Sequence, residues 1–207
     1  TMQMLVGAGL AGVAFTLPTD FFFQASLAVF WLVAFSSATH DIAADGYYML
    51  ALEPHEQAFF VGIRSTFYRI STIAGQGILV MIAGALETST GKIPMSWSIT
   101  FFIMAGLFIA FCLYHKFILP KPASDKPSVT VTASNLMKEF FATFASFFKK
   151  KQVAIAILFM LLYRFPEAQL VKLITPFLID PREVGGLGLT TTEIGLTYGT
   201  IGIIGLT

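Results

Sequence analysis

The sequence predicts an all-α fold, a polytopic membrane helical bundle of about six transmembrane helices with the last one truncated. Of the 207 residues, 56% are hydrophobic and only 12% are charged, whereas soluble domains average about 25% charged residues. The mean hydropathy is +0.76. Apolar runs repeatedly reach the roughly 20 residues that a helix needs to cross a hydrocarbon core of about 30 Å. Strand-like alternation is absent from these runs.

The predicted helices follow one another between clear breaks. They cover residues 2–17, 21–52, 59–86, 97–119 and 152–179, and a sixth begins near residue 191. Proline, glycine and charged residues gather between them, at 18–20, 53–56, 87–96, 120–133 and 180–189. The first run is short, and the chain both begins and stops inside an apolar stretch. We therefore expect an internal fragment of a longer protein.

Basic residues predict the orientation, because cytoplasmic loops are enriched in lysine and arginine. One set of alternate loops carries Arg64, Arg69, Lys116, Lys121, Lys126, Lys138, Lys149, Lys150 and Lys151. The opposite loops carry Lys92 and Arg182. The side of the 115–151 connection is therefore predicted to be cytoplasmic.

Residues 134–151 predict an amphipathic helix with Ser134 or Asn135 as its N-cap. Its apolar residues recur at spacings of three and four: Leu136, Met137, Phe140, Phe141, Phe144, Phe147 and Phe148. One interpretation is a helix lying on the inner leaflet and anchored by residues 149–151. The other is a connector packed on its own protein, and both can hold together.

Ionisable residues inside spans are costly and are usually paired or functional. In the second span, Asp41 and Asp45 share one helical face, and His40 is a candidate proton carrier. If the turn centres near residues 54–55, residues at equal depth have numbers that add up to about 109. This predicts two charge pairs, Asp45 with Arg64 and Asp41 with Arg69. The pairs fit charge-neutralised scaffolding or a gating latch, and direct contact with substrate or protons remains the alternative.

The fifth span carries charges at mid-membrane depth. Counted from Gln152, Arg164 lies about 18 Å deep and Glu167 about 22 Å deep. Pro166 removes a backbone hydrogen bond and is expected to kink the helix. Broken helices with mid-membrane charges are typical of transport sites. The structural alternative is that Arg164 and Glu167 simply neutralise each other.

Several other chemistries find little support in the sequence. Residues 7–12 match G-x-G-x-x-G but lack the strand and crossover of a dinucleotide site, so they are interpreted as a packing face. Asp41 and Asp45 could hold Mg²⁺ only with carboxylates from another helix. A net charge of +1 and a single cysteine, Cys112, favour neither nucleic-acid binding nor a zinc site. We expect no cofactor, no metal and no enzymatic activity.

Two blocks of sequence resemble the AmpG-type muropeptide permeases. Residues 37–47 read S-A-T-H-D-I-A-A-D-G-Y, similar to the family's fourth-helix pattern S-A-T-Q-D-I-x-x-D-A-Y. Residues 162–168 and 175–178, continued by 186–195, resemble the start of the family's second half. The family lies in the major facilitator superfamily, alongside acetyl-CoA transporters. His40 and Gly46 depart from the pattern.

The resemblance implies three parts of a twelve-helix transporter, covering helices 3 to 8. Residues 1–119 would end the N-terminal six-helix half, 120–151 would form the cytoplasmic inter-half linker, and 152–207 would start the C-terminal half. The implied function is proton-coupled import (symport) of an anhydro-muropeptide, a cell-wall recycling product, across the bacterial inner membrane. Its partners would be this solute, H⁺ and the lipid bilayer, with no nucleic acid, and the rest of the chain would lie beyond both ends.

In this interpretation the two halves alternate access to a central cavity, and a carboxylate carries the proton. Glu167 is the first choice and Asp41 the second, with Arg164 holding Glu167 ionised. Candidate substrate contacts are Tyr47, Tyr163, Gln76 and Gln169. Alternatives are a transporter of another solute on this fold, a non-transporting membrane sensor and, as the weakest, a membrane-embedded metal-dependent enzyme.

Overall fold

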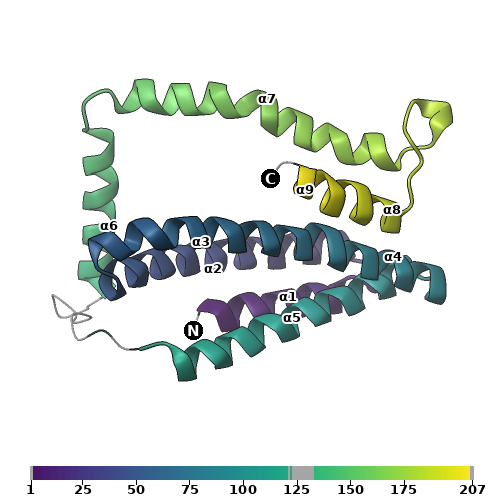
Figure 1. Cartoon of the computed structure of the whole chain (residues 1–207), viewed down its shortest axis with the longest axis horizontal. Helices are drawn as coiled ribbons and strands as arrows, with labels where there is room; N and C mark the ends of the chain where they lie inside the picture. Colours follow the sequence, from purple (N-terminus) through teal and green to yellow (C-terminus); the bar gives the residue numbers. More distant parts are fainter. Residues whose placement is uncertain (1, 121, 123–132, 206–207) are drawn as a thin grey trace. The chain divides into compact units, whose positions relative to one another are not determined.

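The computed structural model describes residues 2–120, 122 and 133–205, and every regular element among them is helical. Figure 1 shows them in chain order. They are α1 (Met2–Thr16), α2 (Phe22–Ala51), α3 (Pro54–Thr72), η1 (Ile73–Ile78), α4 (Leu79–Thr90), α5 (Ile93–Ile118), α6 (Ala133–Phe148), α7 (Val153–Ile179), η2 (Arg182–Val184), α8 (Thr191–Leu196), η3 (Thr197–Gly202) and α9 (Ile203–Gly205). The predicted all-α membrane bundle is confirmed.

Four helical stretches are long and apolar enough to cross a membrane: Phe22–Ala51, Pro54–Thr90, Ile93–Ile118 and Val153–Ile179. Met2–Thr16 is a shorter apolar helix. Large apolar side chains cover the outside of these helices, among them Phe35, Phe117 and Phe159 at 66% exposure or more. A soluble protein avoids such a surface, whereas a hydrocarbon environment accommodates it.

The chain divides into two compact units, the first made of Thr1–Ser124 with Thr190–Thr207 and the second of Asp125–Leu189. In the first unit, α1 packs against both α2 and α5. Val6, Leu10 and Ala105 form its buried apolar cluster. Ser98 Oγ on α5 donates to the Ala14 carbonyl at 2.6 Å and is itself buried. Every described hydroxyl buried in this way has a partner.

The G-x-G-x-x-G run is a packing face, as expected. A Cβ atom at Gly7 would lie 3.1 Å from Ile109 Cγ1, and one at Gly12 would lie 3.3 Å from Val29 Cγ1. Gly9 lies against Val33 still more closely. These glycines therefore let α1 approach α5 on one side and α2 on the other.

The third span begins earlier than predicted, and the polar turn expected at 53–56 is wrong. Only Leu52 and Glu53 separate α2 from α3. Glu53 is the N-cap of a capping box with Glu56, and Pro54 occupies the first helical position. Both features start a helix rather than interrupt one. The residues interpreted as a turn are thus the first turn of α3.

The polar loop expected at 87–96 is also mostly helical. α4 continues to Thr90 and α5 starts at Ile93, so the connection is Gly91 and Lys92. Gly91 closes α4 with φ of 66°, a left-handed conformation that glycine adopts without strain. Ser96 Oγ and Thr90 Oγ1 hydrogen-bond at 2.9 Å across this tight turn. The polar residues therefore stabilise two helix ends instead of forming a loop.

The first unit also contains two π-helical segments, which were not predicted. η1 joins α3 to α4, and η3 joins α8 to α9, so that each pair continues as one helix. η1 and η3 contact each other. Gly75 and Gly77 lie in η1, and Gly199 and Gly202 lie in η3. Glycine has a low propensity for the regular α-helix.

In the second unit, α6 is the predicted amphipathic helix, but it ends at Phe148 instead of Lys151. The three lysines follow it in a turn, where Lys150 Nζ lies 5.8 Å from the centre of the Phe147 ring. Phe140, Phe144 and Phe148 line one face, with successive ring centroids 6.3 and 5.1 Å apart. The side chain of Leu136 lies outside the described residues, as do Lys121 and Lys126.

α7 continues through both Pro166 and Pro176, and Figure 1 shows it changing direction part-way along. The loop after it folds back on the helix end. The N–H groups of Leu187, Gly188 and Leu189 donate to carbonyls of Phe177, Asp180 and Leu178 at 2.8–2.9 Å. These bonds satisfy the last carbonyls of α7, which have no partner within the helix.

Candidate functional site

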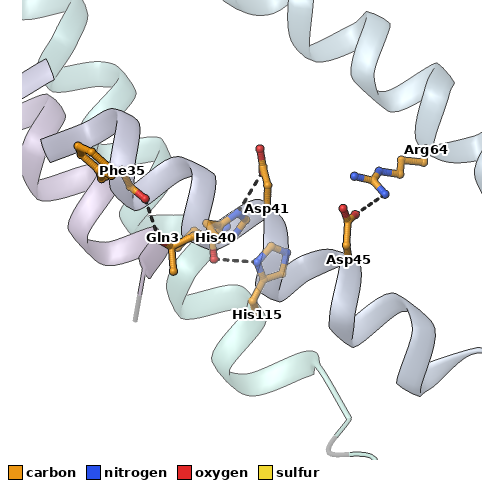
Figure 2. A network of polar contacts seen from close by, with 8 residues as sticks. Gln3, Phe35, His40, Asp41, Asp45, Arg64 and His115 are labelled. Carbon is orange, nitrogen blue, oxygen red and sulfur yellow. Dashed lines mark hydrogen bonds and ion pairs between the residues drawn. The ribbon is translucent and has the colours of Figure 1, made fainter. Parts of the chain in front are cut away.

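The structure joins Asp45 on α2 to Arg64 on α3. Their side chains point toward each other from the two helices (Figure 2). The Arg64 Nη1 and Asp45 Oδ1 atoms are 2.6 Å apart, and the side chains are 60% and 54% exposed. The pair lies about two helical turns from the Leu52–Glu53 connection on α2 and about three turns from it on α3. A carboxylate and a guanidinium at this distance neutralise each other and tie the two helices together.

Asp41 is not joined to Arg69 in the described part of the chain. Its carboxylate lies near the imidazole of its neighbour His40, with Nδ1 and Oδ1 3.8 Å apart. The predicted pairing matched residues by depth along the helices only and did not include their direction around the helix axis. Arg69 follows Arg64 by five residues, so its side chain points about 140° away from the direction of Arg64. Asp41 and Asp45 lie on the same face of α2. Arg64 points toward that face, whereas Arg69 points away from it and cannot pair with Asp41.

A cavity of about 420 Å³ lies beside the Asp45–Arg64 pair. It is lined by Ala44, Tyr47, Tyr48, Ala51, Leu52, Arg64 and Pro120. Tyr47 donates its hydroxyl hydrogen bond to the Pro120 carbonyl at 3.0 Å, and Tyr48 donates to the Gln57 carbonyl. The cavity therefore combines an apolar wall with two phenols and one guanidinium, a lining suited to an amphipathic solute.

Arg164 and Glu167 form an ion pair within α7, one helical turn apart. Both side chains are more than half exposed, and so is Tyr163, whose ring stacks on Phe159 with centroids 5.9 Å apart. Gln169 lies on the same helix and is exposed. The structure thus gathers the fifth-span candidates on one helix of the second unit, while His40, Asp41, Asp45, Tyr47 and Gln76 belong to the first.

Glu87 is a polar residue that sequence reasoning assigned to a loop and missed. It lies in the last turn of α4 and accepts two side-chain hydrogen bonds from other helices. Trp97 Nε1 donates at 2.8 Å from α5, and Thr191 Oγ1 donates at 2.7 Å from α8. The available signal was a lone acidic residue at the end of an apolar run, which does not reveal these partners.

Gln76, by contrast, is an exposed residue of η1 whose backbone carbonyl lies against Gly199. Within the described residues, no three His, Cys, Asp or Glu side chains come together as a metal site would require. Asp41 and Asp45 therefore have no third carboxylate beside them there.

Glu193 lies in the first turn of α8, outside the four spanning helices. The Thr190 backbone N–H and hydroxyl both donate to it at 2.8 Å. These hydrogen bonds hold the pKa of Glu193 below its usual value, because they stabilise the carboxylate form. The capping box fixes where α8 starts.

Comparison with curated proteins gives similar sequences that carry transporter names. Anhydromuropeptide permease of Escherichia coli K12 is 28% identical over 209 residues, which cover 96% of this chain and 40% of that protein. The putative transporters AmpG 4 of Rickettsia conorii and AmpG 2 of Rickettsia typhi are 25% and 28% identical over 84% and 83% of the chain. This chain resembles the AmpG-type permeases.

The similarity to these AmpG-type proteins extends well beyond the two motif blocks, since it includes nearly all of the chain. The chain spans about 40% of the length of the curated relatives that it matches. No family model matches it. No solved structure matches it significantly. The all-α membrane bundle fits the major facilitator assignment that the AmpG resemblance implies.

Proposed function

We propose that this chain belongs to a secondary active transporter of the bacterial inner membrane. The transporter imports anhydro-muropeptides, or a related cell-wall sugar-peptide, together with protons. The observation that carries this proposal is the similarity to a named anhydromuropeptide permease over 96% of the chain. Ion-paired residues on helices long enough to span the membrane support it, because such groups are rarely kept for packing.

The proposed organisation keeps the three parts expected from the resemblance. Residues 1–119 end the first half, 120–151 are the cytoplasmic linker, and 152–207 begin the second half. The lysines around α6 support the cytoplasmic side. The phenylalanine face of α6, followed by Lys149–Lys151, supports a position on the anionic inner leaflet. This linker tethers the two halves while they rock around a central cavity.

Proton coupling is assigned to Glu167, with Asp41 as the second candidate. In the ionised state Arg164 pairs with Glu167. A proton arriving on the Glu167 carboxylate removes that negative charge and leaves the Arg164 guanidinium able to bind a carboxylate of the solute. Release of the proton on the other side restores the pair and expels the solute. Pairing keeps the net charge near zero in the low-dielectric membrane.

Solute recognition is assigned to phenols and amides. Tyr47 lines the cavity beside Arg64, and Tyr163, Gln169 and Gln76 complete the candidate set. Hydroxyls and amides both donate and accept hydrogen bonds, which suits sugar hydroxyls and peptide groups. The Asp45–Arg64 pair acts as a structural latch at the mouth of this cavity. His40 beside Asp41 departs from the AmpG pattern and favours a solute that differs in detail.

The test uses the full-length parent protein in reconstituted vesicles. Uptake of labelled GlcNAc-1,6-anhydro-muropeptide is measured with and without an imposed pH gradient, for wild type and Glu167→Gln. Glu183→Gln, in the loop after α7, is the matched control because it makes the same change outside the spanning helices. We expect gradient-driven uptake in wild type and in the control, and its loss in Glu167→Gln.

Each other outcome corrects a specific element of the proposal. Gradient-driven uptake retained in Glu167→Gln moves the proton to Asp41 or Asp45. Uptake that ignores the gradient removes proton coupling. Solute binding without uptake indicates a sensor, and the absence of both points to another solute.

A further inference from the structure

α8 and η3 pack against α4 and η1 with almost no side chains between them. A Cβ atom at Gly84 would lie 2.5 Å from the Thr192 nitrogen, and one at Gly195 would lie 2.8 Å from the Met81 nitrogen. Gly77 and Gly199 are also in backbone contact, because a Cβ atom at Gly77 would lie 2.9 Å from the Gly199 carbonyl oxygen. Such backbone contact holds only while the two helices keep one register and one separation. We call this contact the glycine seam.

Glu87 closes the glycine seam at one end. It follows Gly84 by three residues and so lies about one turn further along the same side of α4. Both of its carboxylate oxygens are used: Oε1 accepts from Trp97 on α5 and Oε2 accepts from Thr191 on α8. Among the described residues, no other carboxylate accepts side-chain hydrogen bonds from two other helices. All three residues are partly buried.

We infer that Glu87 is a latch that holds the α4–α8 seam shut at the end where α5 begins. The inference rests on the proposed transport function, in whose organisation α4 belongs to the first half and α8 to the second. Opening that end requires α8 to leave α4, and this breaks the Thr191 hydrogen bond. Trp97 holds the carboxylate in place from within the first half. Glu87 is therefore a positioning residue, and it touches no solute.

The latch should respond in a graded manner to loss of each donor. Hydrogen bonds to an ionised carboxylate are about twice as strong as neutral ones, and partial burial shields them from water. Thr191→Val removes one donor with little change of shape, whereas Glu87→Gln removes the negative charge and one of the two acceptor oxygens. We expect Glu87→Gln to raise the open fraction of the seam about tenfold and Thr191→Val to raise it severalfold.

The experiment measures opening without any solute. Cys112→Ala, with any other cysteines of the parent removed, provides the background, and Thr192→Cys places a thiol against Gly84 inside the seam. The full-length protein in lipid nanodiscs, where both faces are accessible, is labelled with a charged maleimide. The labelling rate reports how often the seam opens. Size-exclusion profiles before labelling identify variants that are not folded.

Glu193→Gln is the matched control. Glu193 lies at the same end and also accepts hydrogen bonds, but both come from Thr190 in its own helix cap. Faster labelling with Glu87→Gln and Thr191→Val, but not with the control, supports the latch. Unchanged labelling in both variants overturns it, and so does equal acceleration in the control. If Glu87→Gln does not fold, Thr191→Val alone decides between these outcomes.

The assay separates the latch from the proposed function. Labelling requires neither muropeptide nor a pH gradient. Absence of muropeptide uptake together with a latch-dependent labelling rate would overturn the substrate but not the latch. Muropeptide uptake together with a labelling rate that does not change in the Glu87 and Thr191 variants would overturn the latch but not the substrate.

Discussion

Replacing Gly195 by alanine should separate α8 from α4. A Cβ atom there would lie 2.8 Å from both the nitrogen and Cγ of Met81 and 2.9 Å from the Gly77 carbonyl oxygen. Ordinary contacts of a Cβ atom begin at 3.4 Å, so the helices must part by roughly half an ångström. The Met81 side chain can move aside, but the two backbone atoms cannot move without their helix.

Two opposing contributions set the change in the free energy of unfolding that Gly195→Ala causes. Alanine is better than glycine inside a helix by about 1 kcal/mol. Overpacking of a tight contact costs about 1–3 kcal/mol. Gly106 supplies the matched control, because it lies inside α5 and a Cβ atom there would meet nothing within 4 Å. Gly106→Ala should therefore gain the propensity term alone, and the two variants should differ by about 1–3 kcal/mol.

The assay is reversible unfolding of the full-length protein in mixed micelles, with the free energy of unfolding measured for wild type and both variants. We expect Gly195→Ala to be less stable than Gly106→Ala by about 1–3 kcal/mol. Equal stability of the two variants would refute the backbone contact between α4 and α8. It would also remove the physical basis of the Glu87 latch.

Three other predictions concern separate parts of the chain. A double-mutant cycle with Asp45→Asn and Arg64→Gln should give a coupling of about 0.2–1 kcal/mol if water reaches the pair, since both side chains are more than half exposed; a coupling of zero in unfolding measurements would contradict the ion pair. The lowered pKa of Glu193 means that its cap stabilises α8 above the unfolded pKa of about 4.3 and is lost as the pH falls through the lower, folded value. The protection of amides at the start of α8, taken relative to their intrinsic exchange rate at each pH, should therefore fall in acid for wild type, and Glu193→Gln should abolish that dependence. Replacing Lys149–Lys151 by glutamine should weaken the binding of α6 to anionic lipids by about 1 kcal/mol per lysine, and cross-linking of α6 to these lipids should fall accordingly. Cross-linking equal to wild type would place α6 away from the leaflet.

Much of the fold follows from local sequence. Hydrophobic run length located the spans, and the observed helices Met2–Thr16, Phe22–Ala51 and Val153–Ile179 differ from the predicted ones by a residue or two. The errors at 53–56 and 87–96 share one cause: charged and proline residues were interpreted as breaks. At these positions they begin or end helices, because capping boxes and left-handed glycines also use polar, glycine and proline residues.

The candidate site was predictable only in part. Depth along the helix brought Asp45 level with Arg64, where the structure has an ion pair. Depth alone could not exclude Arg69 as a partner of Asp41, because the direction of a side chain around the helix axis also decides which residues meet. The spacing of Arg164 and Glu167 is local to one helix, so their pairing was visible as the alternative in which they neutralise each other.

The class of fold, the membrane environment and the local charge pattern can be predicted from the chain alone, because they depend on composition and on neighbours within a few residues. The backbone contact between α4 and α8, and the hydrogen bonds by which Glu87 on α4 joins α5 and α8, become visible only in the folded chain. Thr191 lies 104 residues from Glu87 along the chain. Contacts over such separations depend on how whole helices pack, and no local pattern encodes them.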